Sequence, residues 1–438
     1  MFWLYFALVF VVLVVGARLG GIFMGMAGGL GLAVLAFLFH LTPTTPPIDV
    51  MLIILAVVIA ASALQAADGM DFLIQVAEYI LRKNPSRITF LGPIVAYVFT
   101  FLAGTGNVVF SILPVIAEVA RESGVRPERP ISISVIASQQ AITATPISAA
   151  TVALVALLAP FNVSLINILA ISVPATFIGV LAGAVYSSRM GMDLDRDPEY
   201  QERVRKGLVK PFVKKEFFKI TATTNAKISV ALFLFGAVLI TLFGTFPSLR
   251  PLLDYSGKMQ PLSMPHTIEI TMLTISALIV LICKTDVQKI VSGSVFQNGT
   301  MGVACIFGVS WLGDTLITNN LDFIKGGIQQ IVTTHPWVFA IAMFAASVLI
   351  LSQAATVRVL VPLAITLGIP APYIIAAFPA VNGYFFLPTY ATLIAGVAFD
   401  STGTTKIGKF VLNHSYMVPG LITTVVSLVI GYGLAMFL

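Results

Sequence analysis

The sequence predicts an all-α polytopic membrane protein built from two inverted repeats, each with a re-entrant hairpin and a broken helix. Three observations support this prediction. The 438-residue chain is 58% hydrophobic and 10% charged, whereas soluble globular proteins carry about 25% charged residues. Apolar runs of roughly 20 residues, the length that crosses a membrane as a helix, recur along the whole chain. Small and polar residues interrupt these runs at equivalent places in the two halves.

Composition also excludes several classes of function. The pI near 9.3 does not indicate a nucleic-acid partner, because the basic residues cluster in loops, where the positive-inside rule accounts for them. Cys283 and Cys305 lie singly in apolar segments, so we expect neither a disulfide nor a metal site. The sequence contains no Ser-His-Asp set and no nucleotide-binding motif. We therefore expect no enzyme activity and no cofactor.

The first repeat, residues 1–187, begins with three apolar spans and an amphipathic stretch. The spans are expected at 2–17, 20–40 and 49–66. Residues 71–83 alternate apolar and charged side chains at helical spacing, which is typical of a helix lying in the membrane interface. This stretch ends at Asn84-Pro85, a common stop signal for helices.

The next apolar segment, 88–120, is predicted to be a re-entrant hairpin whose tip is Gly104-Thr105-Gly106-Asn107. Basic residues flank it on both sides, so a single crossing would leave one basic cluster outside. A hairpin keeps both flanks inside and satisfies the positive-inside rule. Irregular backbone at such a tip must be buried in protein or line a water-filled cavity.

A broken helix at about 130–160 follows, interrupted near Thr143-Pro146, and the chain returns through 164–187. Residues 188–227 form the one long polar segment, with ten lysines and arginines against six acids. The positive-inside rule places this linker in the cytoplasm. It joins the two repeats.

The second repeat, 228–438, starts with spans at about 228–246, 266–283 and 291–315 and ends with a span at about 411–437. Between them lie a second hairpin at about 337–367, broken at Ser352-Thr356, and a second broken helix at about 371–400, interrupted from Asn382 to Thr389. The order of hairpin and broken helix therefore repeats that of the first half.

Charge placement indicates that the two halves have opposite orientations. With both termini in the periplasm, every lysine and arginine is cytoplasmic except Arg250, Lys258 and Lys325, which lie outside, and Arg358, which lies in the membrane. Inverted repeats with discontinuous helices are typical of secondary transporters, whose site lies near the midplane at the repeat interface. The sequence thus predicts a multi-pass transporter in contact with the lipid bilayer.

The breaks carry mainly neutral hydrogen-bonding side chains. Helix N-termini are partially positive and present free N–H groups, so breaks that converge favour an anion, here one with two negative ends. The candidate substrate-binding residues are Thr105, Gly106, Asn107, Gln139, Gln140, Thr143, Ser148, Ser352, Gln353, Thr356, Arg358, Asn382, Thr389 and Thr392. The alternative is that Gly and Thr serve only helix packing. Packing explains the amides least well, because amides in lipid need partners.

Arg358 is the basic residue deepest in an apolar run, and an intramembrane charge is a functional hypothesis by default. It could bind a carboxylate. Alternatively it could snorkel, or pair with an acid such as Glu118. Asp314, Asp400 and Glu269 lie near span ends, where we expect them to be solvated. The run Ser401-Thr402-Gly403-Thr404-Thr405 has the composition of a phosphate nest but lacks the spacing of a P-loop.

Several motifs resemble those of the anaerobic C4-dicarboxylate transporters, the Dcu family. They are Gly16-Ala17-Arg18-Leu19-Gly20-Gly21-Ile22, Ala103-Gly104-Thr105-Gly106-Asn107, Leu113-Pro114-Val115-Ile116-Ala117-Glu118-Val119-Ala120, Arg126-Pro127-Glu128-Arg129-Pro130, Ser352-Gln353-Ala354-Ala355, and Phe399-Asp400-Ser401-Thr402-Gly403-Thr404-Thr405 with Ile407-Gly408-Lys409-Phe410. The resemblance implies a bacterial inner-membrane carrier that exchanges fumarate, malate or aspartate for succinate. It also implies an elevator-type movement of a substrate-bearing domain against a scaffold.

Three mechanisms stay open at the level of sequence. The first is obligate exchange of C4-dicarboxylates, with the hairpins and broken helices as the moving domain and a homodimer contact on the scaffold spans. The second is Na⁺- or H⁺-coupled dicarboxylate symport, in which unwound carbonyls hold the cation. The third is a receptor, or a transporter that also contacts a membrane sensor partner through residues 188–227.

Overall fold

The computed structural model describes the chain except residues 20, 21, 47, 162, 210–219, 256, 321–333, 351, 389, 409–411 and 438. The described residues are mostly helical, with one two-stranded sheet. This agrees with an all-α polytopic membrane protein. Long apolar runs form helices here because the backbone has no other way to satisfy its polar groups in lipid.

The first half contains twelve elements before its last helix, and the first eleven are named next. They are α1 (Phe2–Leu19), α2 (Phe23–Ala33), the π-helical turn η1 (Val34–Leu38), α3 (Ile48–Ala66), α4 (Gly69–Lys83), η2 (Pro85–Arg87), α5 (Ile88–Ala103), η3 (Gly106–Val108), α6 (Val109–Glu122), α7 (Glu128–Ile142) and α8 (Ala149–Leu158). A short turn, η4 (Ala159–Phe161), then leads into α9 (Leu165–Ser187).

The linker carries α10 (Pro198–Arg205), and the second half follows. Its elements are α11 (Thr224–Thr245), η5 (Pro247–Leu249), β1 (Leu252–Tyr255), β2 (Lys258–Pro261), α12 (Met264–Cys283), α13 (Val287–Ser292), α14 (Ser294–Thr318), α16 (Val338–Ile350), α17 (Gln353–Thr366), α18 (Ala371–Ala377), η6 (Phe378–Phe385), α19 (Ala391–Phe399) and α20 (Met417–Ala435). The strands pair antiparallel, with Leu252 opposite Pro261.

Within the described residues, six helical segments are long and apolar enough to cross a membrane. They are Pro85–Ala103, α9, α11, α12, α14 and α20. A seventh candidate is the pair formed by α3 and α4, which is bent by 72° at residues 67–68. The chain is therefore a multi-pass membrane protein. The first of these segments contains the leading arm of the expected hairpin, so this arm alone has the length of a span.

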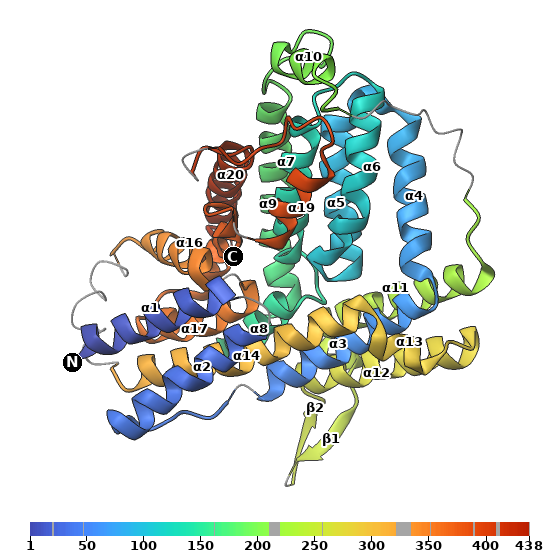
Figure 1. Cartoon of the computed structure of the whole chain (residues 1–438). Helices are drawn as coiled ribbons and strands as arrows, with labels where there is room; N and C mark the ends of the chain where they lie inside the picture. Colours follow the sequence, from blue (N-terminus) through green and yellow to red (C-terminus); the bar gives the residue numbers. More distant parts are fainter. Residues whose placement is uncertain are drawn as a thin grey trace.

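The helices form two layers that cross each other in Figure 1. One layer contains α1, α2, α3, α12, α13 and α14, and the other contains α5, α6, α7, α9, α19 and α20. Helices α8 and α17 pack on each other and also contact α3 and α14, respectively. The helix α10 and the β1–β2 hairpin lie at opposite ends of the molecule (Figure 1).

Close helix packing in the first layer depends on glycine. A Cβ atom on Gly28 of α2 would lie 2.3 Å from the carbonyl carbon of Gly308 on α14. A Cβ atom on Gly25 would lie 2.2 Å from the carbonyl oxygen of Ala304. Small residues let membrane helices approach closely enough for backbone-to-backbone contact. At these positions the packing role proposed for glycine in membrane helices therefore applies.

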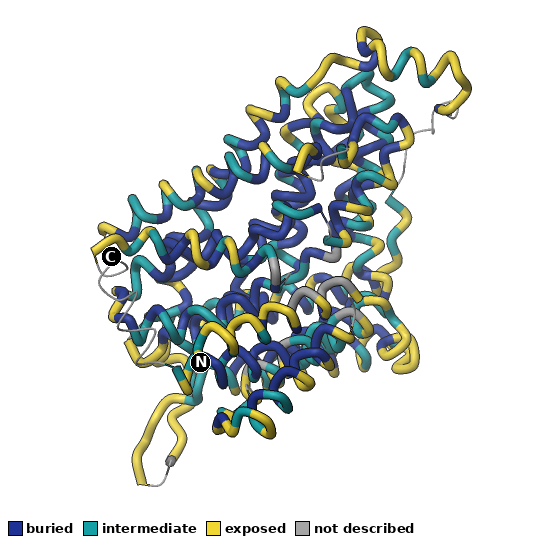
Figure 2. The backbone as a smooth tube through the Cα atoms, turned by 60° about the vertical axis from the view of Figure 1, so that its left-hand side comes forward, coloured by how far each residue is buried: buried dark blue, intermediate teal, exposed yellow. Residues whose placement is uncertain are grey.

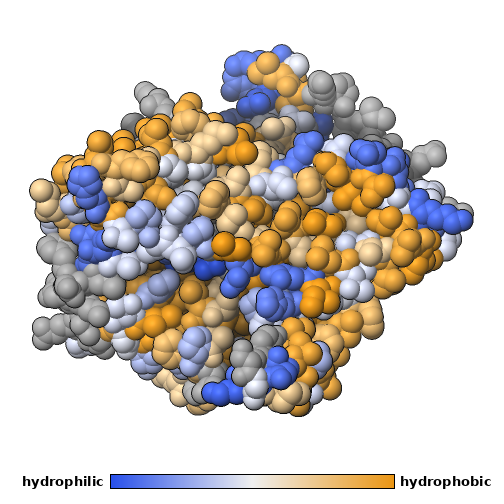
Figure 3. All heavy atoms as spheres, turned by 90° about the horizontal axis from the view of Figure 1, so that it is seen from below, coloured by the Kyte–Doolittle hydropathy of each residue, from blue (hydrophilic) through white to orange (hydrophobic). Residues whose placement is uncertain are grey.

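Burial follows the two layers. Buried residues concentrate along the inner helices, whereas the β hairpin and the outer faces are exposed (Figure 2). The face seen from below is broadly apolar, crossed by patches of polar residues (Figure 3). Over the whole described molecule, the large exposed apolar side chains include Leu30, Phe37, Phe235 and Leu281. An exposed apolar surface of this extent is what lipid tails cover in a membrane protein.

Each break expected from the sequence separates two helices. The first lies between α5 and α6, the second between α7 and α8, the third between α16 and α17, and the fourth between η6 and α19. Helices α5 and α6 contact each other, as do α16 and α17. Re-entry into the membrane and the inverted symmetry of the repeats stay predictions.

Candidate functional site

A cavity of about 480 Å³ lies where the breaks meet the first layer. Its volume falls in the range of ordinary small-molecule sites, about 300–1,000 Å³. One wall comes from α3 and α14 and is largely apolar, with Ile53, Val57, Val295 and Met301. The opposite wall contains residues of all four breaks. Every described lining residue is uncharged.

Four helix N-termini contribute to this second wall. The lining residues are Gly106 just before α6, Ser148 to Ala150 at the start of α8, Ser352 to Ala354 at the start of α17, and Tyr390 and Ala391 at the start of α19. The first N–H groups of a helix have no partner within the helix. They and the helix dipole make each such end favourable for negative charge. The cavity can therefore hold an anion without any basic side chain.

Serine side chains cap two of these ends. The Ser148 Oγ accepts a hydrogen bond from the Thr151 N–H at 3.2 Å and donates one to the Ile142 carbonyl at 2.6 Å. This serine thus joins the end of α7 to the start of α8 across the break. The Ser352 Oγ accepts from the Ala355 N–H at 3.3 Å. Each cap satisfies one N–H group and leaves the first residues of its helix directed to the cavity.

Two glycines shape the tip between α5 and α6. Gly104 ends α5 with a φ of 70°, and a Cβ atom there would lie 2.7 Å from the Ile147 side chain. A Cβ atom on Gly106 would lie 3.0 Å from Oε1 of Gln139. The tip therefore packs tightly against α7 and against the break that follows it. A side chain at either position would displace these neighbours.

A buried network of uncharged side chains lies directly behind the cavity wall. The Gln353 Nε2 donates to the Tyr384 hydroxyl at 2.5 Å, and that hydroxyl donates to the Gln139 Oε1 at 2.7 Å. The Gln139 Nε2 donates to the Thr392 hydroxyl at 3.2 Å. These four side chains are each at most 7% exposed. We call them, together with Gln140, Asn382 and Thr424, the neutral network.

The remaining members extend the network to α20. The Asn382 Nδ2 donates to the Gln140 Oε1 at 3.1 Å, and the Gln140 Nε2 donates to the Thr424 hydroxyl at 3.4 Å. Gln139 and Gln140 belong to the first half of the chain, whereas the other members belong to the second. The network therefore fastens the two halves together behind the cavity.

The structure brings most of the predicted site residues together. Thr105, Gly106, Ser148, Ser352 and Gln353 line the cavity. Gln139, Gln140, Asn382 and Thr392 belong to the neutral network just described. Thr143 and Thr356 are buried and donate to the carbonyls of Gln140 and Ser352. Asn107 lies in η3 next to Gly106, and Thr389 lies outside the described residues.

Arg358 does not line the cavity. It lies farther along α17, half-buried, where Asp314 and Asp49 interact with it electrostatically. The acids that act on Arg358 are thus Asp314 and Asp49, whereas Glu118, the example named for such a pairing, lies 3.1 Å from the Arg82 guanidinium. Arg82 also contacts Glu78 and Glu122. The acids of α6 are therefore used to hold α4.

Two contributors to the site are not predicted from the sequence. Tyr384 occupies the centre of the neutral network, but an aromatic residue in an apolar run gives no signal of a polar role. The apolar wall from α3 and α14 gave no signal either, because its residues match those of any membrane span. The i, i+2 pairing of Asn382 with Tyr384 next to a break was the one pattern that could have indicated the tyrosine.

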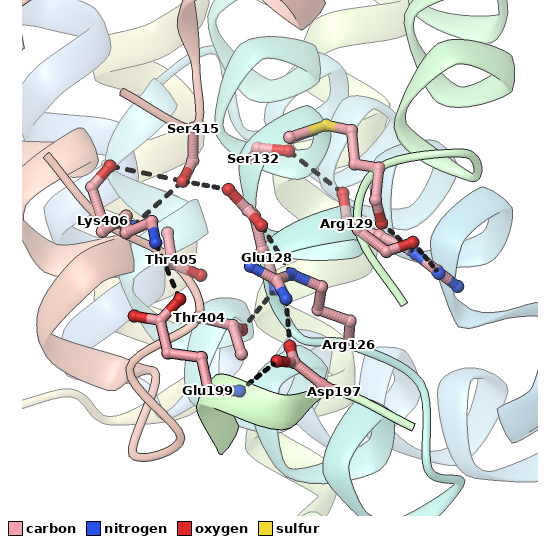
Figure 4. Close-up of polar contacts among 12 residues, drawn as sticks. Arg126, Glu128, Arg129, Ser132, Asp197, Glu199, Thr404, Thr405, Lys406 and Ser415 are labelled. Carbon is pink, nitrogen blue, oxygen red and sulfur yellow. Dashed lines mark hydrogen bonds and ion pairs between the residues drawn. The ribbon is translucent and has the colours of Figure 1, made fainter. Parts of the chain in front are cut away.

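A second polar region lies at the other end of α7, and it is charged (Figure 4). The Arg126 guanidinium lies 2.6 Å from Glu128 and also pairs with Asp197. Glu128 accepts a hydrogen bond from Ser415 at 2.6 Å, and its backbone N–H donates to the Thr404 hydroxyl at 3.2 Å. We call Arg126, Glu128, Asp197, Thr404 and Ser415 the ionic cluster. It joins the start of α7 to the linker and to the loop after α19.

Asp400 corrects one expectation. Its place near the end of a span predicts a solvated side chain, yet it is 6% exposed. Its carboxylate accepts from the N–H groups of Thr402 at 2.9 Å and Thr405 at 2.6 Å, and from the Thr404 hydroxyl at 2.8 Å. A carboxylate from the chain itself thus takes two of the N–H groups of the Ser401–Thr405 run, those of Thr402 and Thr405. This loop holds its own anion and is no phosphate nest.

Comparison with known proteins gives a consistent result. The family described as "Anaerobic c4-dicarboxylate membrane transporter" matches residues 1–438. The C4-dicarboxylate transporter DcuA of Wolinella succinogenes is 45% identical over 433 residues, which covers 97% of this chain and 98% of that one. The C4-dicarboxylate transporter DcuA of Escherichia coli (strain K12) is 42% identical over 433 residues, 98% of each chain.

A solved structure shares the fold at much lower sequence similarity. Neisseria gonorrhoeae MtrF, described as illuminating a class of antimetabolite efflux pumps, aligns with a TM-score of 0.54 at 11% identity. The alignment covers 92% of this chain and 84% of that one. This likeness concerns the fold alone.

Proposed function

The chain belongs to the family of anaerobic C4-dicarboxylate membrane transporters, and on that premise we propose that it exchanges fumarate, malate or aspartate for succinate across a bacterial inner membrane. The hairpins and broken helices form the moving domain, which carries the substrate past a scaffold built from the first layer. Both termini are periplasmic, and the linker is cytoplasmic. The cavity at the four breaks is the substrate site.

The observation that carries this proposal is the convergence of four helix N-termini on an uncharged cavity. Each N-terminus is equivalent to roughly half a positive charge, about two charges in all. Two carboxylates neutralise that amount. A cation finds no acid among the described lining residues, so the cavity favours the dianion over Na⁺ as the primary ligand.

The packing of the helices suggests how the two carboxylates are divided. Helix α8 contacts α17, and α6 contacts α19. Each pair contains one helix from each half of the chain. We assign one carboxylate to each pair, with the carbon chain between them against the apolar wall of α3 and α14. A linear four-carbon diacid has an apolar middle and two charged ends, which matches this division.

Exchange follows from the absence of a built-in counter-charge. An empty site would carry several uncompensated N-termini into the low-dielectric interior during its movement, and isolated charge there is costly. A bound dicarboxylate removes that cost, so the loaded carrier moves and the empty one stalls. The apolar wall on α3 and α14 supports sliding, since no described hydrogen bond joins the neutral network to it.

The test is uptake of labelled fumarate by purified protein in vesicles loaded with succinate. The wild type should take up fumarate, and Gln353→Ala and Asn107→Ala should raise the KM about tenfold or more with the fold intact. Gln201→Ala is the matched control, because Gln201 lies on α10 and donates to the Leu194 carbonyl. Absence of dicarboxylate uptake by the wild type would overturn the proposal. Normal uptake by both site variants would refute the assigned site.

A further inference from the structure

Tyr384 carries a buried hydroxyl that has no role in the transport mechanism proposed above. It is 1% exposed, and its hydroxyl is the centre of the neutral network. It accepts from the Gln353 Nε2 at 2.5 Å and donates to the Gln139 Oε1 at 2.7 Å. A second acceptor, the Asn382 Oδ1, is more distant at 3.3 Å. These are the shortest contacts that Gln353 and Gln139 make within the network.

The direction of these bonds fixes two side-chain amides. A phenol has one proton to donate and lone pairs to accept with. The proton goes to the Gln139 carbonyl oxygen, so the amide nitrogen of Gln353 must face the phenol oxygen. Reversal of either amide would place two donors or two acceptors against each other. The other acceptors near the Gln353 Nε2, on Asn382 and Gln139, are at 3.3 and 3.4 Å.

The ring of Tyr384 is also held in place from the cavity side. Its centroid lies 4.5 Å from that of Tyr390, which lines the cavity and precedes α19. Through these contacts Tyr384 reaches the N-termini of α17 and α19 and the end of α7, which leads to the N-terminus of α8. Gln353 begins α17, Gln139 lies near the end of α7 before α8, and Tyr390 precedes α19. Its place at this junction suits a residue that sets their mutual geometry.

We propose that Tyr384 is a positioning residue of the dicarboxylate site, which acts by holding the Gln353 amide and with it the first turn of α17. This inference rests on the proposed function. Without the hydroxyl, Gln353 keeps only its longer contacts, and its side chain gains rotamers that reach into the cavity. The site must then be ordered by the substrate at the moment of binding, which weakens affinity. Turnover of the loaded carrier depends on charge compensation and changes less.

The alternative is that Tyr384 contributes only to stability, as a buried tyrosine does elsewhere. Tyr97 provides the comparison within this chain. It is 4% exposed, and its hydroxyl shares a 2.7 Å hydrogen bond with Thr176 between α5 and α9. It does not line the cavity and does not belong to the neutral network. Tyr97→Phe therefore removes a similar buried bond without altering the site.

The experiment measures the KM and maximal rate of fumarate exchange, together with thermal unfolding, for the full-length protein in vesicles. Tyr384→Phe should raise the KM about five- to tenfold, the size expected for one lost hydrogen bond, with the maximal rate within about twofold of wild type. Tyr97→Phe should lower the unfolding temperature about as much as Tyr384→Phe does, but it should leave the KM unchanged. In a Gln353→Ala background, Tyr384→Phe should have no further effect on the KM.

That last comparison separates positioning from packing. Additive effects of Tyr384→Phe and Gln353→Ala on the KM would overturn the inference, because Tyr384 would then act by another route. An unchanged KM for Tyr384→Phe would overturn it as well. If Tyr384→Phe does not accumulate, Gln139→Met removes the acceptor of the same hydroxyl together with the bond to Thr392, and it should raise the KM less in the Gln353→Ala background than in the wild type. Failure of the proposed function is distinguishable, since the wild type would then show no dicarboxylate exchange.

Discussion

The two ends of α7 are built from opposite kinds of polar chemistry. At its start, Glu128 joins the ionic cluster, where Arg126 and Asp197 are also buried. At its end, Gln139 and Gln140 join the neutral network behind the cavity. The described members of the network are all uncharged. One helix thus connects a region held by ion pairs to a region that avoids charge altogether.

The difference follows from what each end must do. The ionic cluster is permanently paired, so its charges can stay buried without a ligand. Under the proposed function, the cavity end is alternately empty and occupied during a transport cycle. A fixed cation there would be left unpaired whenever the substrate departs, at a cost of several kcal/mol. Partial charges on helix N-termini and neutral amides attract an anion at a smaller cost when it is absent. Full charges therefore stabilise the structure at the start of α7, and partial charges suit the exchange that we propose at its end.

The largest expected effect comes from breaking the ionic cluster. Arg126→Gln leaves the buried carboxylates of Glu128 and Asp197 without their shared cation, which should destabilise the protein by about 3–5 kcal/mol. Thermal unfolding in detergent measures the loss. Arg196→Gln is the control, because Arg196 is exposed and lies 3.8 Å from Asp195, a pair that contributes little. Equal unfolding temperatures for the two variants would contradict the structural role assigned to the ionic cluster.

The second effect comes from placing a full charge at the neutral end. Ala391 is the first residue of α19 and lines the cavity. An aspartate there suits the helix dipole, so the fold should persist, but it would occupy the place that we propose for a substrate carboxylate. Ala391→Asp should weaken fumarate binding about 100-fold or more, measured by calorimetry on purified protein. Thr224→Asp, at the exposed start of α11, should bind as the wild type does. Retained binding by Ala391→Asp would contradict the anion site.

A smaller effect distinguishes serines that only cap a helix from serines that also contribute to substrate binding. Ser148, Ser352 and Ser164 all cap helices through their hydroxyls, but Ser164 does not line the cavity. Replacement of each by alanine should cost about 1 kcal/mol of stability. The KM for fumarate should rise for Ser148→Ala and Ser352→Ala alone, because their helices begin at the cavity that we propose as the substrate site. A similar rise for Ser164→Ala would mean that the KM follows stability and not the site.

The smallest effect concerns the rim of the ionic cluster. Lys406 and Glu199 form an ion pair at 3.0 Å, with both side chains about half exposed. Such pairs contribute about 0–1 kcal/mol and are screened by salt. Lys406→Gln should therefore change the unfolding temperature little, and the difference should vanish at high salt. A loss of stability as large as that of Arg126→Gln would mean that this exposed pair contributes as much as the buried pairs of the ionic cluster.

The positions of the breaks could be predicted from sequence because glycine, serine and amide residues are conspicuous in apolar runs. Gly104, Ser148 and Ser352 each mark a helix end, and their helices do surround one cavity. Tyr384 could not be predicted, since its role depends on partners brought together only by folding. The same holds for the ionic cluster. In the sequence, the positive-inside rule is enough to account for Arg126. No neighbouring residue indicates that Asp197 pairs with it.

Asp400 shows a different limit. An acid near the end of a span is usually solvated, and no pattern in the flanking residues predicts its burial. In the fold, its carboxylate instead caps the loop that follows it, through Thr402, Thr404 and Thr405. The bonding partners were adjacent in the chain, but their conformation depends on the packing of this loop against the start of α7.

The most direct test of this account compares succinate-loaded with empty vesicles, using labelled fumarate outside and no Na⁺ gradient. A site that lacks a counter-charge predicts rapid uptake into loaded vesicles and almost none into empty ones, because the unloaded carrier cannot return. Equal uptake into empty vesicles, or uptake into them that depends on a Na⁺ gradient, would contradict it. The empty site would then cross the membrane with charge compensation that the neutral cavity does not provide.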